Sequence, residues 1–265
     1  MIRVGVVGAS GWASGTHLPA LTHLPQFRVT AVATTNQASA DRVAKEYGVP
    51  YALSETEALA GHPEVDLVVV AVKAPAHAGV INAALKHGKH VVSEWPLGVD
   101  VEQARALVEM AEAAAVQHAV VLQGHHSPDA RFVADLVADD RIGRLDVVIM
   151  VADGDPFGGA TIPAELAWSL EPSGGTSILP IMAGHFLATL ERIAGPLAEV
   201  RARLPRAGEY VRVAGTGEDV VNHNPRHVLL AGTWPGAPRF LLPSLAETVR
   251  AGSDSPSNSW APRDS

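Results

Sequence analysis

The sequence predicts an α/β protein in which a doubly wound parallel sheet comes first and a smaller α+β domain follows. Three observations support this prediction. Short β-branched runs alternate with helical segments over residues 1–122, as in consecutive βαβ units. A glycine-rich turn follows the first of these runs directly. After residue 122 the alternation ends, and Gly- and Pro-rich stretches separate the remaining strand and helix candidates.

The composition excludes several classes of protein. A chain of 265 residues with 47% hydrophobic content can form one large or two ordinary domains. The formal net charge of -8 argues against a nucleic-acid partner. There are no cysteines, so no disulfide framework or thiolate metal site is expected. No apolar run reaches the ~18 residues of a membrane span, so we expect a cytoplasmic protein with no membrane partner.

The first half contains five strand candidates, each a short run of mostly apolar residues. These are Ile2–Val7, Arg28–Thr34, Asp66–Val72, His90–Ser93 and Ala119–Leu122. Helices are expected after Gly11 and at Ala38–Tyr47, Glu55–Ala60, Pro75–His87 and Asp100–Val116. Gly48 and Gly88 follow two of these helices, and Asp100 with Gln103 forms a capping-box pattern.

The turn after the first strand is a candidate phosphate-binding site. Free amides and the positive end of a helix meet at such a turn. The dinucleotide fingerprint requires glycine at its first, third and sixth positions, which here hold Gly8, Ser10 and Ala13. The match is partial, so an ordinary turn between strand and helix is the alternative.

Polar and turn residues follow every predicted strand of the sheet. Ligands bind beyond the carboxyl ends of parallel strands, so these endings predict a binding cleft. The endings are Gly8-Ala9-Ser10, Thr34-Thr35-Asn36, Lys73 to His77, Glu94 to Gly98, and Gln123 to Pro128.

The second half reads as an α+β domain over residues 123–246. Its predicted elements are helices at Asp129–Ala138 and Ile178–Ile193 and strands at Arg144–Val151, Ala198–Leu204, His227–Gly232 and Arg239–Leu242. Asp153–Ser173 is rich in Gly and Pro and is expected to form a long loop over the cleft. The tail, residues 247–265, has no hydrophobic periodicity and is expected to be disordered.

Four stretches of the chain resemble the Gfo/Idh/MocA family of NAD(P)-dependent oxidoreductases. They are VGVVGASGWASGTHLPAL, ALKHGKHVVSEWPLGVD, QGHHSP and GGTSILPIMAGHFLATL, and they cover roughly residues 1–240 in the family's order. The resemblance implies a Rossmann-type domain over residues 1–122, an α+β domain that carries substrate and oligomer contacts, and hydride transfer between nicotinamide and a sugar- or polyol-like substrate. The residues that it and the strand ends assign to the cofactor are Gly8, Ser10, Gly11, Trp12, Ala13, Thr34, Thr35, Asn36, Val72, His77, Glu94, Trp95 and Gln123.

The chain departs from the family pattern where that pattern carries catalysis. Trp95 replaces the lysine that exchanges a proton with substrate, and indole N–H is a donor only. Ile181 and Ala188 replace two aspartates around His185. His185 is therefore the expected acid–base group, and Lys73, where many relatives have proline, is a possible helper.

The second strand ends without the acidic residue that binds the ribose 2′-hydroxyl of NAD. Thr34, Thr35 and Asn36 stand there instead, and neutral groups do not repel a 2′-phosphate. The cofactor expected is NADP or NAD, with a weak preference for NADP.

One branch of the family fits these departures. Fungal galactose-pathway repressors resemble the chain in the Gly-Trp-Ala turn, Glu-Trp for Glu-Lys, the Leu-Gln-Gly strand exit and the Gly-His helix. The resemblance implies a second hypothesis, a dinucleotide-binding regulator without turnover. A third is a C-terminally truncated relative, because the second domain is short of strands; a homodimer is expected only if that domain is complete.

Each candidate residue has a simpler interpretation. His185 and Trp95 could be ordinary core residues, and Trp95 could instead be a stacking wall beside the nicotinamide. Lys73 could be a surface lysine, and Trp12 is expected to pack its helix against the sheet. His125 and His126 have no third ligand at suitable spacing, so no metal site is predicted.

Overall fold

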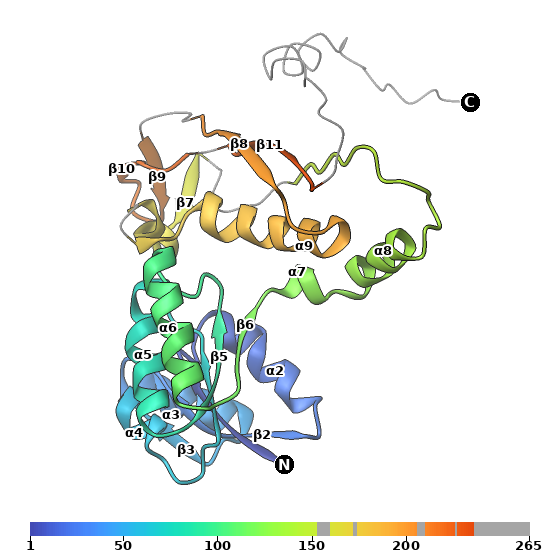
Figure 1. Cartoon of the computed structure of the whole chain (residues 1–265). Coiled ribbons are helices and arrows are strands. Elements are labelled where there is room, and N and C mark those ends of the chain that lie inside the picture. The colour runs from blue at the N-terminus through green and yellow to red at the C-terminus, as the bar shows by residue number, and fades with distance from the viewer. Residues whose placement is uncertain (153–159, 172–173, 206–209, 226, 236–265) are drawn as a thin grey trace, which may run out of the picture.

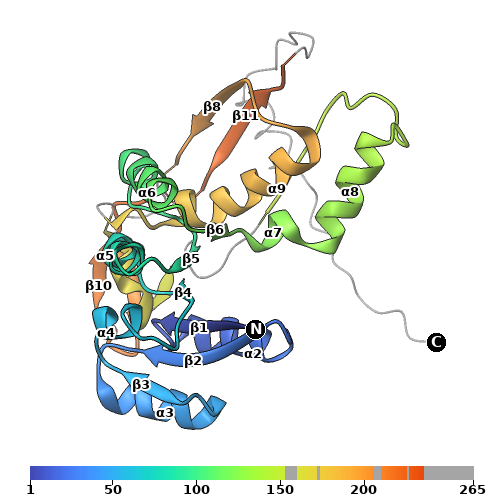
Figure 2. The same cartoon turned by 60° about the horizontal axis from the view of Figure 1, so that its bottom comes forward.

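The computed structural model describes residues 1–152, 160–171, 174–205, 210–225 and 227–235. Two parts are visible: a layered α/β part that carries the N-terminus, and a second part built around one long helix (Figure 1). The same two parts separate clearly when the molecule is turned (Figure 2).

The first part is a six-stranded parallel sheet in the order β3-β2-β1-β4-β5-β6. The strands are β1 Ile2–Val7, β2 Phe27–Ala33, β3 Tyr51–Leu53, β4 Leu67–Val70, β5 His90–Glu94 and β6 His118–Val121. This is the doubly wound order, and it confirms the predicted fold class. Only β3, a three-residue strand after Pro50, was absent from the sequence prediction.

Helices cover both faces of this sheet. They are α1 Trp12–Gly15, α2 His17–Thr22, α3 Gln37–Tyr47, α4 Thr56–Ala60, α5 Ala74–Lys86 and α6 Val101–Ala113. Their predicted ends have a structural basis. Asp100 accepts a hydrogen bond from the amide of Gln103, and Gly48 ends α3 in the left-handed conformation.

Two apolar clusters hold these layers together. β4 is buried on both faces, so its successive residues serve both clusters. Val68 and Val70 pack with Leu59 and the residues of α5 and α6, whereas Leu67 and Val69 pack with those of α1, α2 and α3. The continuous apolar run that predicted a doubly covered strand is therefore explained by its position in the middle of the sheet.

The second part has two small sheets and a helical layer. Its helices are α7 Gln123–His126, α8 Pro128–Ala138, the 3₁₀ helix η1 Ala164–Leu170, the π-helix η3 Ile178–Ala183 and α9 Gly184–Ala194. Its strands are β7 Thr161–Pro163, β8 Glu199–Arg203, β9 Tyr210–Ala214, β10 Asp219–Val221 and β11 Leu229–Thr233. They form the sheets β10-β9-β7 and β11-β8.

Several expectations for the second part were wrong. The predicted strand at 144–151 has no strand partner among the described residues, and Val147, Ile149 and Val151 are 70%, 84% and 92% exposed. An alternating apolar pattern specifies a strand only where a neighbouring strand supplies hydrogen bonds. The expected helix at 178–193 is observed, but its first turns are π-helical.

Some elements of the second part were not predicted, and some predictions fall on residues that the structure does not describe. β7, β9 and β10 are short strands that the sequence did not predict. The predicted strand at 239–242, the tail at 247–265 and part of the expected loop at 153–173 lie outside the described residues. The described part of that loop was predicted wrongly, because it contains β7 and η1. Among the described helices, none is long and apolar enough to cross a membrane.

Leu59 provides a test of this packing. Its side chain is fully buried, and a Cβ added to Gly5 on β1 would lie 2.6 Å from Leu59 Cδ2. Leu59→Ala should lower the free energy of unfolding by about 2–5 kcal/mol, because it removes buried apolar volume from a close-packed site. Urea denaturation followed by circular dichroism measures this change. Leu24→Ala, at an exposed apolar residue, is the control, and a loss as large as that of Leu59→Ala would contradict the assigned core.

Candidate functional site

The turn between β1 and α1 has a backbone that only glycine can adopt at two positions. Gly8 has φ 82°, and a Cβ there would lie 2.3 Å from the carbonyl oxygen of Ala71. Gly11 has φ 68° and ψ −124°, a region essentially closed to L side chains. The turn therefore has glycine, at Gly8 and Gly11, at the two positions where its backbone conformation requires it.

This turn also presents unpaired backbone donors. The amides of Gly8 and Ala9 donate to the carbonyl of Ala33, at 2.9 and 3.2 Å. The next four amides, residues 10–13, have no acceptor in the part of the chain that the structure describes. Ser10 and Gly11 are exposed, so an anion can reach this row of N–H groups.

The end of β2 is partly occupied by its own structure. The Thr34 hydroxyl donates to the carbonyl of Asn36 at 2.8 Å, and Asn36 Oδ1 caps α3 by accepting from the Ser39 amide at 2.9 Å. Thr34 is buried, whereas Thr35 and Asn36 are exposed. Thr35 and the amide nitrogen of Asn36 are therefore the groups left to contact a ligand.

The loop after β4 contains one exposed and one buried candidate. Lys73 is exposed, and its ammonium lies 5.0 Å from the ring centre of Trp168 on η1, a cation–π contact between the two parts. Val72 lies against Gly8, where an added Cβ would come within 2.9 Å of its Cγ1.

His77 on α5 is almost completely buried and has partners at both ring nitrogens. Nε2 lies 2.9 Å from the Val72 carbonyl and Nδ1 lies 3.4 Å from Ser93 Oγ. Burial lowers the pKa of the His77 imidazole, so it stays neutral at neutral pH. This geometry favours a role in fixing the loop over direct contact with a cofactor.

Glu94, the last residue of β5, binds the turn from across the sheet edge. Its Oε1 accepts from Trp12 Nε1 at 3.1 Å and pairs with His17 Nε2. The Trp12 side chain is therefore not packed against the sheet as expected: it is 58% exposed and is held at its indole nitrogen. His17 was missed by the sequence reasoning, although it stands within the motif, nine residues after Gly8.

Trp95 joins the two parts of the molecule. Its indole N–H donates to the carbonyl of Pro180 in η3 at 2.6 Å. The ring lies against Gly184 at the start of α9, where an added Cβ would come within 2.6 Å of Nε1. Trp95 thus fills an interface between the end of β5 and the helices of the second part, and its stacking role beside the nicotinamide stays a prediction.

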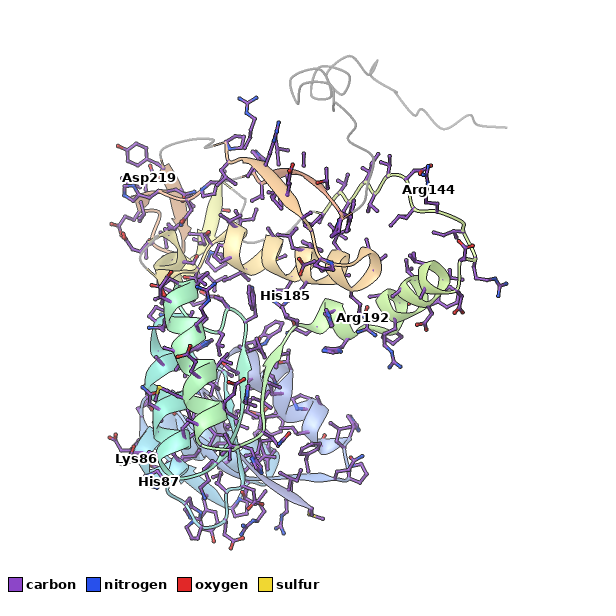
Figure 3. The ribbon with its side chains drawn as sticks, in the orientation of Figure 1. Lys86, His87, Arg144, His185, Arg192 and Asp219 are labelled. Carbon is purple, nitrogen blue, oxygen red and sulfur yellow. The ribbon has the colours of Figure 1, made fainter. Side chains whose placement is uncertain are left out.

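His185, directly after Gly184, lies on the side of α9 that faces the N-terminal part (Figure 3). Burial lowers the pKa of its imidazole, and the negative charge of Glu94 opposes that shift. His185 also directly follows Gly184, which lies against the ring of Trp95, the residue after Glu94. A half-buried, neutral imidazole can accept a proton from a bound hydroxyl group at neutral pH.

A second group of polar side chains lies between α7 and α9. Gln123 is exposed at the start of α7. Among the described residues, His125 Nδ1 and Arg192 Nε are buried without a hydrogen-bond partner. Burial lowers the pKa of His125, and the neighbouring His126 and Arg192 lower it further. The described residues contain no group of three or more side chains placed to hold a metal ion.

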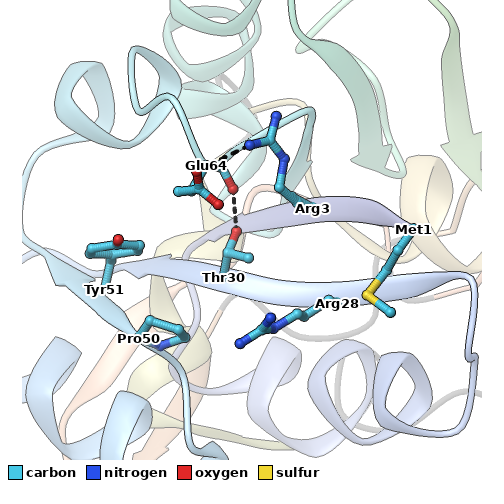
Figure 4. Close-up of a pocket in the computed structure, with 7 residues that line it drawn as sticks. All are labelled: Met1, Arg3, Arg28, Thr30, Pro50, Tyr51 and Glu64. Atoms are coloured by element: carbon cyan, nitrogen blue, oxygen red, sulfur yellow. Dashed lines mark hydrogen bonds and ion pairs between the residues drawn. The ribbon is translucent and has the colours of Figure 1, made fainter.

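A pocket also lies at the opposite edge of the parallel sheet (Figure 4). Arg3, at the beginning of β1, points into it but is already paired with Asp66 and Glu64, at 2.5 and 3.3 Å. Because ligands of such sheets bind at the carboxyl ends of the strands, we do not assign this pocket to the site.

Two family models match the chain in sequence order. Residues 2–122 match the oxidoreductase family with an NAD-binding Rossmann fold, and residues 128–237 match the Gal80p C-terminal domain. The chain belongs to the Gfo/Idh/MocA family. Its Gal80-like second half confirms the resemblance drawn from the sequence.

Known relatives of this Gfo/Idh/MocA chain include both enzymes and regulators. The dehydrogenase aclE of Aspergillus oryzae is 30% identical over 210 residues, which are 76% of this chain and 57% of the relative. The crystal structure of a super-repressor mutant of Gal80p from Saccharomyces cerevisiae superposes with a TM-score of 0.78 at 25% identity, over 88% of this chain and 64% of that one. A 3-ketoreductase from Actinomadura kijaniata, solved with TDP-benzene and NADP, is 36% identical with a TM-score of 0.51, over 54% and 45% of the two chains. The chain thus spans about half to two thirds of the length of these relatives.

The Trp95–Gly184 contact can be tested by adding one methyl group. Gly184→Ala should place Cβ against the indole ring and lower the free energy of unfolding by about 1–3 kcal/mol, the usual cost of overpacking. Gly79→Ala is a matched control: it is also a helical glycine, but no atom lies within 4 Å of its added Cβ. Thermal unfolding of the two variants measures the difference. Equal stability of Gly184→Ala and wild type would contradict this contact.

The buried histidines predict how stability depends on pH. The pKa values of His77, His125 and His185 are lowered in the folded protein, so below about pH 6.5 the unfolded chain binds more protons than the folded one. The free energy of unfolding should therefore fall as the pH is lowered from 7.5 to 5. Asp66, whose pKa Arg3 holds down, loses its contribution only below about pH 4 and does not confuse this window. Urea denaturation at a series of pH values tests the sign; stability that is constant or rises on acidification would contradict it.

Proposed function

We propose that the chain is an NAD(P)-binding oxidoreductase that transfers a hydride between the nicotinamide and a sugar- or polyol-like substrate. The observation that carries the proposal is the convergence at one sheet edge of unpaired turn amides, the Glu94 carboxylate and the His185 imidazole. A dinucleotide needs an anion site for its pyrophosphate, polar contacts for its riboses and an apolar surface beside the nicotinamide ring. Gly8 and Gly11, which have no side chain, leave the turn accessible to the pyrophosphate.

Most of the predicted site residues would contact the cofactor. The amides of residues 10–13 would bind the pyrophosphate, and Thr35 with Asn36 would contact the adenosine ribose. The preference for NADP over NAD continues to rest on the missing acidic residue at this strand end. Glu94 would contact the nicotinamide half, because it is bound to Trp12 beside the turn and precedes Trp95, which lies against α9.

The nicotinamide supplies the hydride chemistry, and the proton must come from or go to the protein. Trp95 cannot move that proton, since its N–H is committed to the carbonyl of Pro180. We assign the step to His185, whose lowered pKa leaves its ring free to accept the proton of a substrate hydroxyl during oxidation. Lys73 is a second candidate helper, but it would have to leave Trp168 to act.

A dinucleotide-binding regulator without turnover is the second candidate function. The match of residues 128–237 to the Gal80p C-terminal domain supports it, as does the loss of the proton-exchanging lysine at Trp95. The homodimer and the cytoplasmic location expected from the sequence stay predictions under either function.

One set of assays separates the two functions. Nicotinamide fluorescence should increase when NADPH or NADH binds, and absorbance at the nicotinamide band should then fall with a ketose or inosose from a substrate panel. His185→Ala should slow this turnover by about 10²–10⁴-fold, the usual contribution of an acid–base group. His118→Ala, an exposed residue at the start of β6, is the control.

The possible results differ for each hypothesis. Binding without turnover across the panel would favour the regulator, whereas turnover that survives in His185→Ala would remove the assigned proton carrier. A folded protein that binds neither nucleotide would overturn both functions.

A further inference from the structure

We propose that His17 is a positioning residue of the dinucleotide site, which it serves through Glu94. The inference rests on the proposed function and adds to it a residue outside the turn and outside the catalytic pair. The carboxylate is the group that would meet the nicotinamide half, and His17 determines which of its oxygens is available.

Glu94 receives two donors on the same oxygen. His17 Nε2, at the start of α2, and Trp12 Nε1, on α1, both bind Oε1. Oε2 has no donor among the residues that the structure describes. The side chains of His17 and Glu94 are 16% and 13% exposed, so water competes weakly for this pair.

The arrangement has a physical consequence for ligand binding. A carboxylate has about four acceptor positions, and occupation of Oε1 by two protein donors leaves Oε2 for hydroxyl or amide donors. Riboses and the carboxamide of nicotinamide carry such donors. A carboxylate held in one rotamer before binding loses less side-chain entropy when the ligand arrives.

Among the described residues around Glu94, His17 and Trp12 contact its carboxylate directly. The carboxylate also influences His77 on α5 and His185 on α9, but only through its field. Trp12, the other donor, is 58% exposed and is not ionisable. His17 is therefore the partner whose loss would free the carboxylate to rotate.

The test is a titration of NADH and NADPH against variants of His17, followed by nucleotide fluorescence. His17→Ala should weaken binding by about tenfold, the loss expected when one hydrogen bond to a charged group no longer orients it. His17→Gln, whose amide nitrogen can reach the position of Nε2, should recover most of the affinity. His17→Asn, which is too short to reach Glu94, replaces the alanine variant if that one does not fold.

Two comparisons separate positioning from a merely structural role. In a Glu94→Ala background His17→Ala should have little further effect, because a residue that acts through Glu94 has nothing left to orient. His23→Ala, an exposed histidine at the other end of α2, should bind like wild type. A structural residue would lower the melting temperature in every background and would leave the affinity of the folded protein unchanged.

The possible results separate the role of His17 from the proposed nucleotide-binding function. No nucleotide binding by folded wild type would overturn the proposed function and this inference with it. Binding by wild type and His17→Ala with equal affinity would overturn the role of His17 alone. Additive losses from His17→Ala and Glu94→Ala would likewise show that His17 does not act through Glu94.

Discussion

Two consecutive side chains at the carboxyl end of β5, Glu94 and Trp95, connect this strand to the phosphate turn and to the second part of the molecule. Glu94 reaches the phosphate turn through Trp12 and His17, and Trp95 reaches the second part through Pro180. Glu94 is the last residue of β5 and Trp95 is the first residue after it, so one strand end contacts both neighbours. Hydrogen bonds therefore link the end of β5 to α1, α2 and η3, and η3 leads directly into α9, which carries His185.

This linkage bears on how the site would respond to a ligand. A dinucleotide that contacts the turn and Glu94 binds at the same strand end that fixes α9 through Trp95 and Gly184. A ligand whose contacts at this strand end differed between two arrangements of the parts would couple its affinity to their relative position, and such coupling is reciprocal. An enzyme would use such coupling to align His185, and a regulator would use it to present its second part to a partner.

Much of the parallel sheet could be predicted from the sequence, because each of its strands is locally specified. β4 is an uninterrupted apolar run, and α3 and α6 begin at side chains that cap them, Asn36 and Asp100. The second part was predicted less well. The apolar alternation that ends in Val151 resembles a strand, but strand formation depends on a partner that a local pattern does not contain.

Site residues could be predicted from the sequence where a local motif limits the residue types that can stand at a position. The glycines of the turn and the candidate His185 could be found, because backbone conformation and acid–base chemistry limit the residue types allowed there. The contact of His17 with Glu94 joins residues 77 positions apart, and that of the exposed Trp12 with Glu94 joins residues 82 positions apart. Such long-range contacts depend on the completed sheet order, which only the folded chain defines.

The departures from the family pattern are better understood together than one by one. Trp95 removes a proton carrier, but its indole requires a position without Cβ, which Gly184 provides, and an acceptor, which the Pro180 carbonyl provides. The π-helical turns at Ile178–Ala183 lie directly before Gly184 and set the phase in which His185 follows it. A single packing arrangement thus explains why an indole at Trp95 needs a glycine at Gly184 and why His185 follows at this position. Under the proposed function, turnover would depend on the protonation of His185, since the indole N–H of Trp95 is already bound to the Pro180 carbonyl.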